Sequence, residues 1–359
     1  MSERKLAHVE KIINIEPIDG ADKIEVATVL GWKCVIAKKD NYKIGDLVVY
    51  IEVDSRVPDI SIFEFLRDRN FKVKTIKLRK QISQGLIVPI LTLPKGKYVE
   101  GTDVTKELGI TKILSETEEK DKLVYKSSKN SIVIYFMRFK WFRKLREKLI
   151  KPEKMKYPTY LSKTDEERIQ NIPQMLTQYK DKLFYVTEKI DGQSLTLYKH
   201  GNKYGVGSRN WILLKEDNSS WWTIANNIKY KEVLNSIFKY YSSAKTIILQ
   251  GEILGPNIQS NKYKLTNFDF YAFNIIVDNV QLSYDEMKLI LDKVNVESVI
   301  CLDDNFILPE TVDELVEYSK GKSKLMSTIE REGIVIRLKE DAKVSFKVIN
   351  PNFLLRFDF

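Results

Sequence analysis

Residues 9–93 consist of short runs of β-branched and aromatic residues separated by turn signals. Two of these runs are "VATVLGWKCVIA" and "DLVVYIEV", and the segments between the runs include "DGAD", "YKIGD" and "SQG". Short strands at this spacing are typical of a small barrel. The N-terminal part of the chain is therefore predicted to fold into a compact β-barrel.

The chain is long and basic. Its 359 residues are enough for two ordinary domains, and 43% apolar and 11% aromatic residues indicate a globular protein. The formal net charge of +10 favours a polyanionic partner, although a basic surface can also serve solubility alone. Because a compact barrel in a basic chain often holds nucleic acid, an OB-type barrel is the preferred prediction.

Two residue types are scarce, and their scarcity limits the possible chemistry. His8 and His200 are the only histidines, and Cys34 and Cys301 are the only cysteines. Histidine triads, zinc sites and a disulfide framework are therefore not expected, and a reducing compartment fits. The N-terminus lacks an apolar secretion signal and no apolar run could span a bilayer, so we expect an intracellular protein without membrane contact, with the compartment, cytoplasmic or another, left open.

The middle of the chain is predicted to be a linker between two domains. The charged stretch "LSETEEKDKLVYKSSKN" lacks periodicity, and "FMRFKWFRKLREKLIKPEKMK" predicts a basic amphipathic helix that ends before Pro152. The aromatic residues of this helix either pack into a groove between domains or contact nucleic acid directly. The predicted parts of the chain are the barrel at 1–115, a linker with this helix at 116–156, and a second domain at 157–359.

The second domain mixes α and β patterns. "TDEERIQNIPQML" predicts a helix with Thr164 as N-cap and Glu167 completing a capping box. "TVDELVEYSKGK" repeats this pattern from Thr311 and ends at a glycine. Strands that carry polar residues lie between and after these two segments, so the overall fold class is expected to be α+β.

One lysine stands out in "VTEKIDGQSL". Lys189 follows a β-type run and precedes Asp191-Gly192, with the carboxylate of Glu188 on its other side. An Asp-Gly pair between strands is a common hairpin turn, which explains the glycine and leaves the lysine unexplained. With so few histidines, acid-base or nucleophilic chemistry must come from lysine, carboxylate, serine or tyrosine side chains.

Further strand-like segments each carry a residue that a nucleotide site needs. They are "YGVGSRNWI" with Ser208 and Arg209, "TIILQGEILGP" with Glu252, "NFDFYAFNII" with Phe268 and Phe270, "REGIVIRLK" with Glu332, and "KVSFKVIN" with Lys347. Each of these residues, taken alone, has a structural explanation: a solvated strand end, an apolar core, or a lysine that protects an edge strand.

Taken together and in this order, the segments resemble the covalent nucleotidyltransferase superfamily of ATP-dependent DNA and RNA ligases and mRNA capping enzymes. Lys189-Ile190-Asp191-Gly192 matches the signature nucleotidyl motif. Six ordered segments over 188–350 make a chance match improbable. The resemblance implies a C-terminal nucleotidyltransferase (adenylyltransferase) domain built from antiparallel sheets and helices.

The N-terminal half narrows the resemblance. "IEPIDGADKIEVATVLGWKCVIAKKDNYKIGDLVVYIEVDSRVP" and "FKVKTIKLRKQISQGLIVPI" are similar to the N-terminal OB module of the RNA ligase clade typified by the Deinococcus and Naegleria enzymes, and so is "LSKTDEERIQNIP". DNA ligases and capping enzymes generally carry the OB domain after the lysine domain, whereas here only a few residues follow Lys347. The resemblance therefore favours an RNA ligase.

The resemblance also implies roles for the residues. Lys189 would attack the α-phosphorus of ATP and form a lysyl-AMP, which requires a pKa lowered by burial or by cations such as Mg²⁺ and Lys347. Lys347 would neutralise the α-phosphate. The remaining assignments are nucleotide contacts at Glu188, Arg209, Glu252, Phe270 and Glu332, with Arg209 on ribose and phosphate and Phe270 on adenine, and Mg²⁺ or Mn²⁺ binding at Asp191, Glu252 and Glu332.

In the reaction that the resemblance implies, AMP passes to a 5′-phosphate end, and a 3′-hydroxyl then displaces it to join RNA ends or a nicked duplex. A monomer is expected. The OB module would dock the polyanion, which fits the positive net charge. Candidate contacts are Lys77, Arg79, Lys80 and Gln81 in "IKLRKQISQG", and Arg168 before the lysine strand.

One departure from the family pattern concerns the closing motif. Many relatives have Lys-x-Lys, whereas this chain has Ile349 at the position of the second lysine. Lys343 would lie on the strand face of Lys347 and could substitute if the register permits.

Three alternatives remain open from the sequence. A capping guanylyltransferase would use the same lysine with GTP, and a DNA ligase would act on DNA. A non-catalytic RNA-binding protein with a decayed transferase domain is the third, although the intact Lys189, Asp191, Glu252, Glu332 and Lys347 argue against decay.

Overall fold

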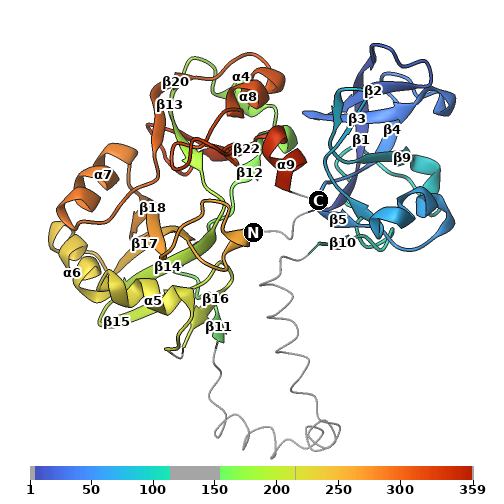
Figure 1. Ribbon diagram of the computed structural model, residues 1–359. Helices are drawn as coiled ribbons and strands as arrows, with labels where there is room; N and C mark the ends of the chain where they lie inside the picture. The colour runs from blue at the N-terminus through green and yellow to red at the C-terminus, as the bar shows by residue number, and fades with distance from the viewer. Residues whose placement is uncertain (1–4, 114–153, 215, 358–359) are drawn as a thin grey trace, which may run out of the picture. The chain divides into compact units, whose positions relative to one another are not determined.

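The computed structural model describes residues 5–113, 154–214 and 216–357 (Figure 1). The chain forms two compact units. Unit 1 comprises Met1–Arg143, Gln170–Pro173 and Leu354–Phe359, and unit 2 comprises Lys144–Ile169 and Gln174–Phe353. The predicted linker with its basic helix lies outside the described residues, apart from its last few positions.

Unit 1 contains a bent antiparallel sheet, the half-barrel of an OB fold. Its strand order is β3-β2-β1-β4-β9. The long strand β1 pairs with β4 through its first half and with β2 through its second, and the register shifts between Ile12 and Asn14. The strands are β1 (Ala7–Pro17), β2 (Ile24–Val29), β3 (Trp32–Ala37), β4 (Leu47–Ile51) and β9 (Leu86–Pro89).

Alternating side chains of this sheet pack into two apolar clusters, as the period of two in a strand requires. One cluster includes Val49 and Phe63, and the other includes Trp32, Val48 and Tyr50. Smaller elements complete unit 1: β5 (Ser55–Arg56), β6 (Lys72–Val73), β7 (Ile76–Leu78), β8 (Gln81–Ser83), β10 (Thr111–Lys112), and the 3₁₀ turns η1 (Lys38–Asp40), η2 (Ser61–Arg69) and η3 (Ile90–Thr92).

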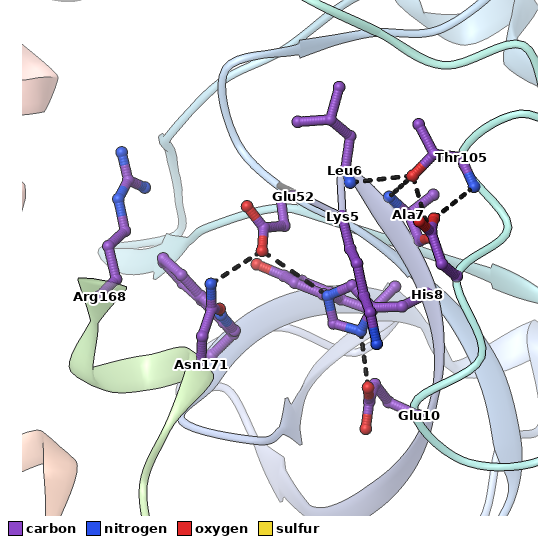
Figure 2. Close-up of polar contacts among 12 residues, drawn as sticks. Lys5, Leu6, Ala7, His8, Glu10, Glu52, Thr105, Arg168 and Asn171 are labelled. Atoms are coloured by element: carbon purple, nitrogen blue, oxygen red, sulfur yellow. Dashed lines mark hydrogen bonds and ion pairs between the residues drawn. The ribbon is translucent and has the colours of Figure 1, made fainter. Parts of the chain in front are cut away.

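A buried ionic cluster joins β1 and β4 of unit 1, and Figure 2 shows its dashed contacts. The Nδ1 atom of His8 lies 2.7 Å from Glu10, and its Nε2 atom lies 3.7 Å from Glu52. Asn171 donates to Glu52 at 2.9 Å and accepts from the indole N–H of Trp32 at 2.6 Å. Burial lowers the pKa of His8, but the two carboxylates outweigh it and raise the pKa to about 9. His8 is therefore a cation at neutral pH.

Unit 2 contains two sheets. The larger has the order β11-β16-β15-β14-β17-β18-β19, and the smaller has the order β12-β22-β21-β13-β20. Strands of the larger sheet are β11 (Lys154–Lys156), β14 (Gln193–His200), β15 (Lys203–Gly207), β16 (Trp211–Leu213), β17 (Thr246–Leu254), β18 (Asp269–Val277) and β19 (Val280–Gln281). Strands of the smaller sheet are β12 (Glu167–Arg168), β13 (Leu183–Lys189), β20 (Cys301–Ile307), β21 (Gly333–Leu338) and β22 (Ser345–Ile349).

Three helices lie beside the larger sheet in Figure 1: α5 (Ser220–Asn227), α6 (Tyr230–Tyr240) and α7 (Tyr284–Lys293). They pack on alternate residues of β14 and β17, such as Leu197 and Leu249, whereas Ile248 faces a separate cluster on the opposite side. The other helical segments are η4 (Ile169–Asn171), α4 (Met175–Gln178), η5 (Gln259–Asn261), α8 (Val312–Ser319) and α9 (Pro351–Phe357). No helix in the described ranges is long and apolar enough to cross a membrane.

The two helix predictions have opposite outcomes. The capping box at Thr311 is confirmed, because Thr311 and Glu314 bond reciprocally at the start of α8. The helix predicted from Thr164 is wrong, since this segment forms β12, η4 and the short α4. Tertiary contacts override the local pattern here: the hydroxyl of Thr164 bonds Ser194, and the carboxylate of Glu166 accepts from Arg337.

Candidate active site

The turn at Ile190–Gly192 carries the chain from the smaller sheet of unit 2 to the larger one, since β13 ends at Lys189 and β14 begins at Gln193. On one side of the turn, Lys189 pairs with Gly333 at the start of β21. On the other side, Ser194 pairs with Glu252 of β17. The two registers therefore bring Lys189, Glu252 and Glu332 together from segments distant in the sequence.

Glycine is required in this turn because of close packing. A Cβ atom at Gly192 would lie 2.4 Å from the carbonyl oxygen of Ile253 and 2.8 Å from the side chain of Glu252. No larger residue fits without moving the backbone that carries Glu252. The Asp-Gly pair is thus a junction between two sheets and not a simple hairpin turn.

Lys189 forms an ion pair with Glu332. Its Nζ atom lies 2.7 Å from Oε2 of Glu332, and both side chains are mostly shielded from solvent. Burial lowers the pKa of Lys189, but the carboxylates of Glu332, Glu252 and Asp191 outweigh it and raise the pKa above its ordinary value. These carboxylates include the predicted metal ligands, so the lowering of the Lys189 pKa that was expected beside bound Mg²⁺ stays a prediction.

Burial also raises the pKa values of the carboxylates that face Lys189. Burial, together with Glu332 and Asp191, raises the pKa of Glu252 to about 8, even though Lys189 and Arg209 act in the opposite direction. Burial also raises the pKa of Glu332. Glu252 makes no side-chain hydrogen bond within the described part of the chain. The site thus concentrates carboxylate oxygens in a poorly solvated place, where a cation would be stabilised.

Lys347 lies on β22, with Val335 of β21 on one side and Arg168 of β12 on the other. Burial lowers the pKa of Lys347 to about 8, and the cations Arg168, Lys189 and Arg209 act in the same direction. Asp165 opposes this shift from 3.8 Å. Lys347 is therefore a shielded amine within a group of positive charges, and its contact with phosphate stays a prediction.

Asp165 is a residue that the sequence did not single out. Its carboxylate accepts a hydrogen bond from Arg209 and also lies near Lys347, so it connects two of the predicted site residues. In the sequence, Asp165 belongs to the acidic segment that predicted a helix N-terminus, and this pattern does not indicate a contact with Arg209 or Lys347. Its side chain instead serves as a shared anion for two cations.

The Asp191 carboxylate also has a cationic partner that was not predicted. Lys262 donates a hydrogen bond to Oδ2 of Asp191, and the backbone N–H of Asp191 donates to the hydroxyl of Tyr263 at 3.0 Å. Both partners come from the loop between β17 and β18. No sequence motif marks this loop, so only tertiary structure reveals the contact.

The remaining predicted nucleotide contacts lie around the same strands. Glu188 is buried, with Oε2 accepting from the backbone N–H of Lys324 at 2.8 Å and Oε1 without a partner among the described residues. Phe270 lies opposite Ile253 and packs on Gly251, where a Cβ atom would be 2.4 Å from its ring. Both side chains are buried, and Phe270 belongs to the apolar cluster of the larger sheet, so their contacts with a nucleotide stay predictions.

The candidate nucleic-acid contacts fall into two groups. Lys77, Arg79 and Lys80 are exposed on the β7–β8 hairpin of unit 1, and Gln81 is half-buried there. Arg168 instead belongs to unit 2, where it is buried beside Lys347. Nothing in the structure tests contact with RNA, so all five assignments stay predictions.

The closing-motif question has a structural answer. Ile349 is buried on β22, opposite Gly333. Lys343 precedes β22 in an exposed turn, where its backbone N–H bonds Asp341, so the idea that it shares a strand face with Lys347 is wrong. A second lysine is not supplied by Lys343.

Across the described ranges, no group of three or more histidine, cysteine or acidic side chains is arranged as a metal site. This arrangement is compatible with Mg²⁺ or Mn²⁺, because such ions often use one or two carboxylates together with substrate phosphates. The assignment of metal binding to Asp191, Glu252 and Glu332 remains a prediction.

Comparisons with known proteins agree on both units. A family model for RNA ligase matches residues 182–349, and a model for an OB-fold domain matches residues 6–90. A comparison with curated protein sequences gives no match.

Among solved structures, those of Naegleria gruberi RNA ligase are similar along the whole chain. A mutant with ATP and Mn is 30% identical with a TM-score of 0.79, and covers 99% of this chain and 99% of its own. An apo mutant is 31% identical with a TM-score of 0.80, covering 100% of this chain and 99% of its own. The complex with PPi is 30% identical with a TM-score of 0.80, covering 99% of each chain. The chain belongs to the RNA ligase family.

Proposed function

We propose that this protein is an ATP-dependent RNA ligase that joins 5′-phosphate and 3′-hydroxyl ends through a lysyl-AMP. The observation that carries the proposal is the position of Lys189, which lies at a strand end, 2.7 Å from Glu332 and in the field of Glu252 and Asp191. The relatives named above include complexes with ATP, Mn and PPi, which are the substrate, a metal and a product of such a step.

In the first step, the Lys189 amine forms a bond to the α-phosphorus of ATP while the bond to pyrophosphate breaks. Lys189 must lose a proton before it attacks, since its raised pKa keeps it protonated. Glu332 is placed to accept this proton, because it contacts Nζ directly and its own pKa is raised by burial. Lys347 faces the developing phosphate charge as a cation.

Asp191, Glu252 and Glu332 would hold the divalent metal. Their fit rests on the donor set: carboxylate oxygens suit Mg²⁺ and Mn²⁺, and the pKa of Glu252 is raised to about 8 because burial and neighbouring anions disfavour its charge. When bound, the metal supplies positive charge that stabilises the phosphate and competes with protons at the site.

The other residues orient the nucleotide. Arg209, which Asp165 holds in place, would contact the ribose and phosphate. Phe270 would stack on adenine, and the free Oε1 acceptor of Glu188 would receive a donor from the base. These assignments are tested by nucleotide binding to single variants.

The second and third steps need a polynucleotide. AMP moves from Lys189 to a 5′-phosphate, and a 3′-hydroxyl then displaces AMP and forms the phosphodiester bond. We propose a nicked duplex as the substrate and a monomer as the active form. The hairpin lysines and arginine of unit 1, Lys77, Arg79 and Lys80, and the shielded Arg168 of unit 2 would contact the RNA backbone.

The test is a labelling experiment. The purified protein is incubated with α-labelled ATP or GTP and Mg²⁺ or Mn²⁺, denatured, and examined for retained label, with Lys189→Ala and Lys189→Met as comparisons. We expect label from ATP with the wild type and none with either variant. Label from GTP alone would indicate capping chemistry, and no label under any condition would refute the ligase mechanism in favour of RNA binding.

The nucleic-acid class is tested separately. Nicked duplexes that differ only in a ribose or deoxyribose at the 3′-hydroxyl end are sealed by a lysyl-AMP preparation without free ATP. A requirement for ribose supports an RNA ligase. Equal sealing of both ends would favour a DNA ligase.

A further inference from the structure

The loop between β17 and β18, residues 255–268, folds onto the Asp191-Gly192 turn through three contacts. Lys262 donates to the Asp191 carboxylate, and Tyr263 accepts from the Asp191 backbone N–H at 3.0 Å. The Gln259 side chain donates to the carbonyl oxygen of Gly192 at 3.4 Å. One loop thus contacts Asp191 and Gly192, the second and third residues after Lys189.

The backbone of this loop is strained. Residues with left-handed backbone angles are Asn257 (φ 62°), Gln259 (φ 45°), Ser260 (φ 58°), Asn261 (φ 46°) and Lys264 (φ 53°). Such angles are unfavourable for residues other than glycine, and they persist where surrounding contacts impose them. Asn261 provides some of these contacts by bonding both the carbonyl and the N–H of Leu265.

The Lys262 ammonium is held from three directions. Besides the Asp191 carboxylate, it donates to the carbonyl oxygen of Gln259 at 3.2 Å and lies 5.5 Å from the ring centroid of Phe353. The side chains of Lys262 and Asp191 are only 14% and 16% exposed. An ion pair shielded to this degree is stronger than an exposed one, because water screens it less.

Lys262 and Lys189 therefore differ in their carboxylate partners. Lys189 pairs with Glu332 and is the nucleophile of the proposed function. Lys262 pairs with Asp191 and lies on a loop outside the nucleotidyl motif. A divalent cation that binds Asp191 would lie close to the Lys262 ammonium, and the two positive charges would repel each other.

We propose that Lys262 is a positioning residue that acts through Asp191, as an internal counter-cation that competes with the divalent metal for this carboxylate. Metal binding then displaces the ammonium and removes one of the three contacts that hold the 255–268 loop on the turn. Lys262 thus sets the metal concentration that the site requires. This inference rests on the proposed function, in which Asp191 contributes to metal binding.

The experiment measures Mn²⁺ binding to the full chain without ATP, from the loss of the electron paramagnetic resonance signal of free Mn²⁺. In Lys262→Met the competitor is gone, so we expect the Kd for Mn²⁺ to fall on the order of fivefold. In Lys262→Arg the guanidinium can donate two hydrogen bonds to the Asp191 carboxylate, so the Kd for Mn²⁺ should stay at the wild-type value or rise. The control is Lys264→Met, which removes the exposed lysine of the same loop and should change nothing.

A double-mutant cycle with Asp191→Asn identifies the route of the effect. If Lys262 acts through Asp191, then Lys262→Met has no effect on Mn²⁺ binding in the Asp191→Asn background. A purely structural Lys262 would instead give weaker Mn²⁺ binding in Lys262→Met and a lower melting temperature.

An unchanged or higher Kd in Lys262→Met overturns the proposal, as does an equal gain in the Asp191→Asn background. If Lys262→Met does not fold, a lower Kd in Lys262→Arg overturns it. The Mn²⁺ measurement needs no turnover, so its result is independent of the ATP-labelling test. Labelling without a Mn²⁺ effect refutes the role of Lys262 alone, whereas a Mn²⁺ effect without labelling refutes the ligase assignment.

Discussion

Each unit of the protein contains a shielded cluster of opposite charges, and the two clusters differ in what holds their carboxylates. In unit 1, Glu52 accepts from the Asn171 amide at 2.9 Å and lies 3.7 Å from the His8 ring. Both partners are short side chains close to the backbone. In unit 2, Glu332 and Asp191 are held by Lys189 and Lys262, whose charges lie at the ends of long, flexible side chains.

From this difference we infer that the cluster of unit 1 stabilises the fold and that the cluster of unit 2 serves the proposed reaction. Asn171 donates to Glu52 and accepts from the Trp32 indole N–H, so hydrogen bonds fix the polar groups of the first cluster in place. The second cluster leaves Glu252 without a side-chain hydrogen bond in the described part of the chain. Carboxylates paired with movable cations can exchange these cations for a metal or a substrate, at the expense of local stability.

The sharpest test makes the same substitution in both clusters. Glu252→Gln should reduce lysyl-AMP formation by about a hundredfold or more, because it removes the proposed metal and nucleotide contact. Its free energy of unfolding should stay within about 1 kcal/mol of wild type, since burial and neighbouring anions already disfavour the charged form of Glu252. Single-turnover labelling and urea unfolding measure the two quantities. A large loss of stability without a loss of labelling would reverse the assignment of this cluster.

Glu52→Gln should have the opposite profile. It leaves the buried His8 cation with one carboxylate partner in place of two, and breaking a buried ionic cluster in this way costs about 3 kcal/mol. Urea unfolding should show this loss, with the transition of unit 1 moved to lower urea. Unchanged unfolding would mean that Glu10 alone neutralises His8.

The pH dependence of unit 1 follows from His8. Its pKa is raised from an ordinary 6.5 to about 9 in the folded protein, so the folded state binds this proton more tightly than the unfolded state does. The stability is therefore fully present below pH 6.5 and is lost as the pH rises toward 9. This shift corresponds to roughly 3 kcal/mol. Unfolding of wild type and His8→Gln at several pH values measures it, and a constant difference between them would contradict it.

The Asn171 amide should contribute less. Asn171→Ala leaves the Trp32 indole N–H and one Glu52 oxygen without this partner, which costs about 1 to 3 kcal/mol. The matched control is Asn14→Ala on β1, where the side chain is exposed and, among the described residues, accepts only from the neighbouring backbone N–H of Ile15. Equal losses in the two variants would mean that Asn171 does not close the cluster.

The sequence predicted the strand-borne part of the candidate site and missed the part carried by loops. Lys189, Glu252, Glu332 and Lys347 could be found because short motifs on regular strands fix their positions, and the strand registers bring them together. The sequence pattern gave no sign of Lys262, since its contact with Asp191 depends on a loop with unusual backbone angles.

The same limit explains the errors. Thr164 and Glu167 form a sound local capping pattern, but Asp165 pairs with Arg209 from the turn between β15 and β16, and Glu166 pairs with Arg337 of β21. The raised pKa of Lys189 could not be predicted from its motif either. Its sign depends on the balance between burial and three carboxylates, and this balance is a property of the folded site.

The smallest effect is expected at an exposed ion pair, which gives the baseline for both clusters. Lys182 and Glu340 lie 3.1 Å apart, with side chains 50% and 65% exposed. Water and salt screen such a pair, so Lys182→Ala should change the free energy of unfolding by no more than about 0.5 kcal/mol, and less at high ionic strength. Urea unfolding at low and high salt measures this change. A loss as large as that of Glu52→Gln would mean that shielding from solvent does not distinguish the two clusters from the surface. The contrast between the cluster of unit 1 and that of unit 2 would then depend only on the long, flexible side chains of Lys189 and Lys262.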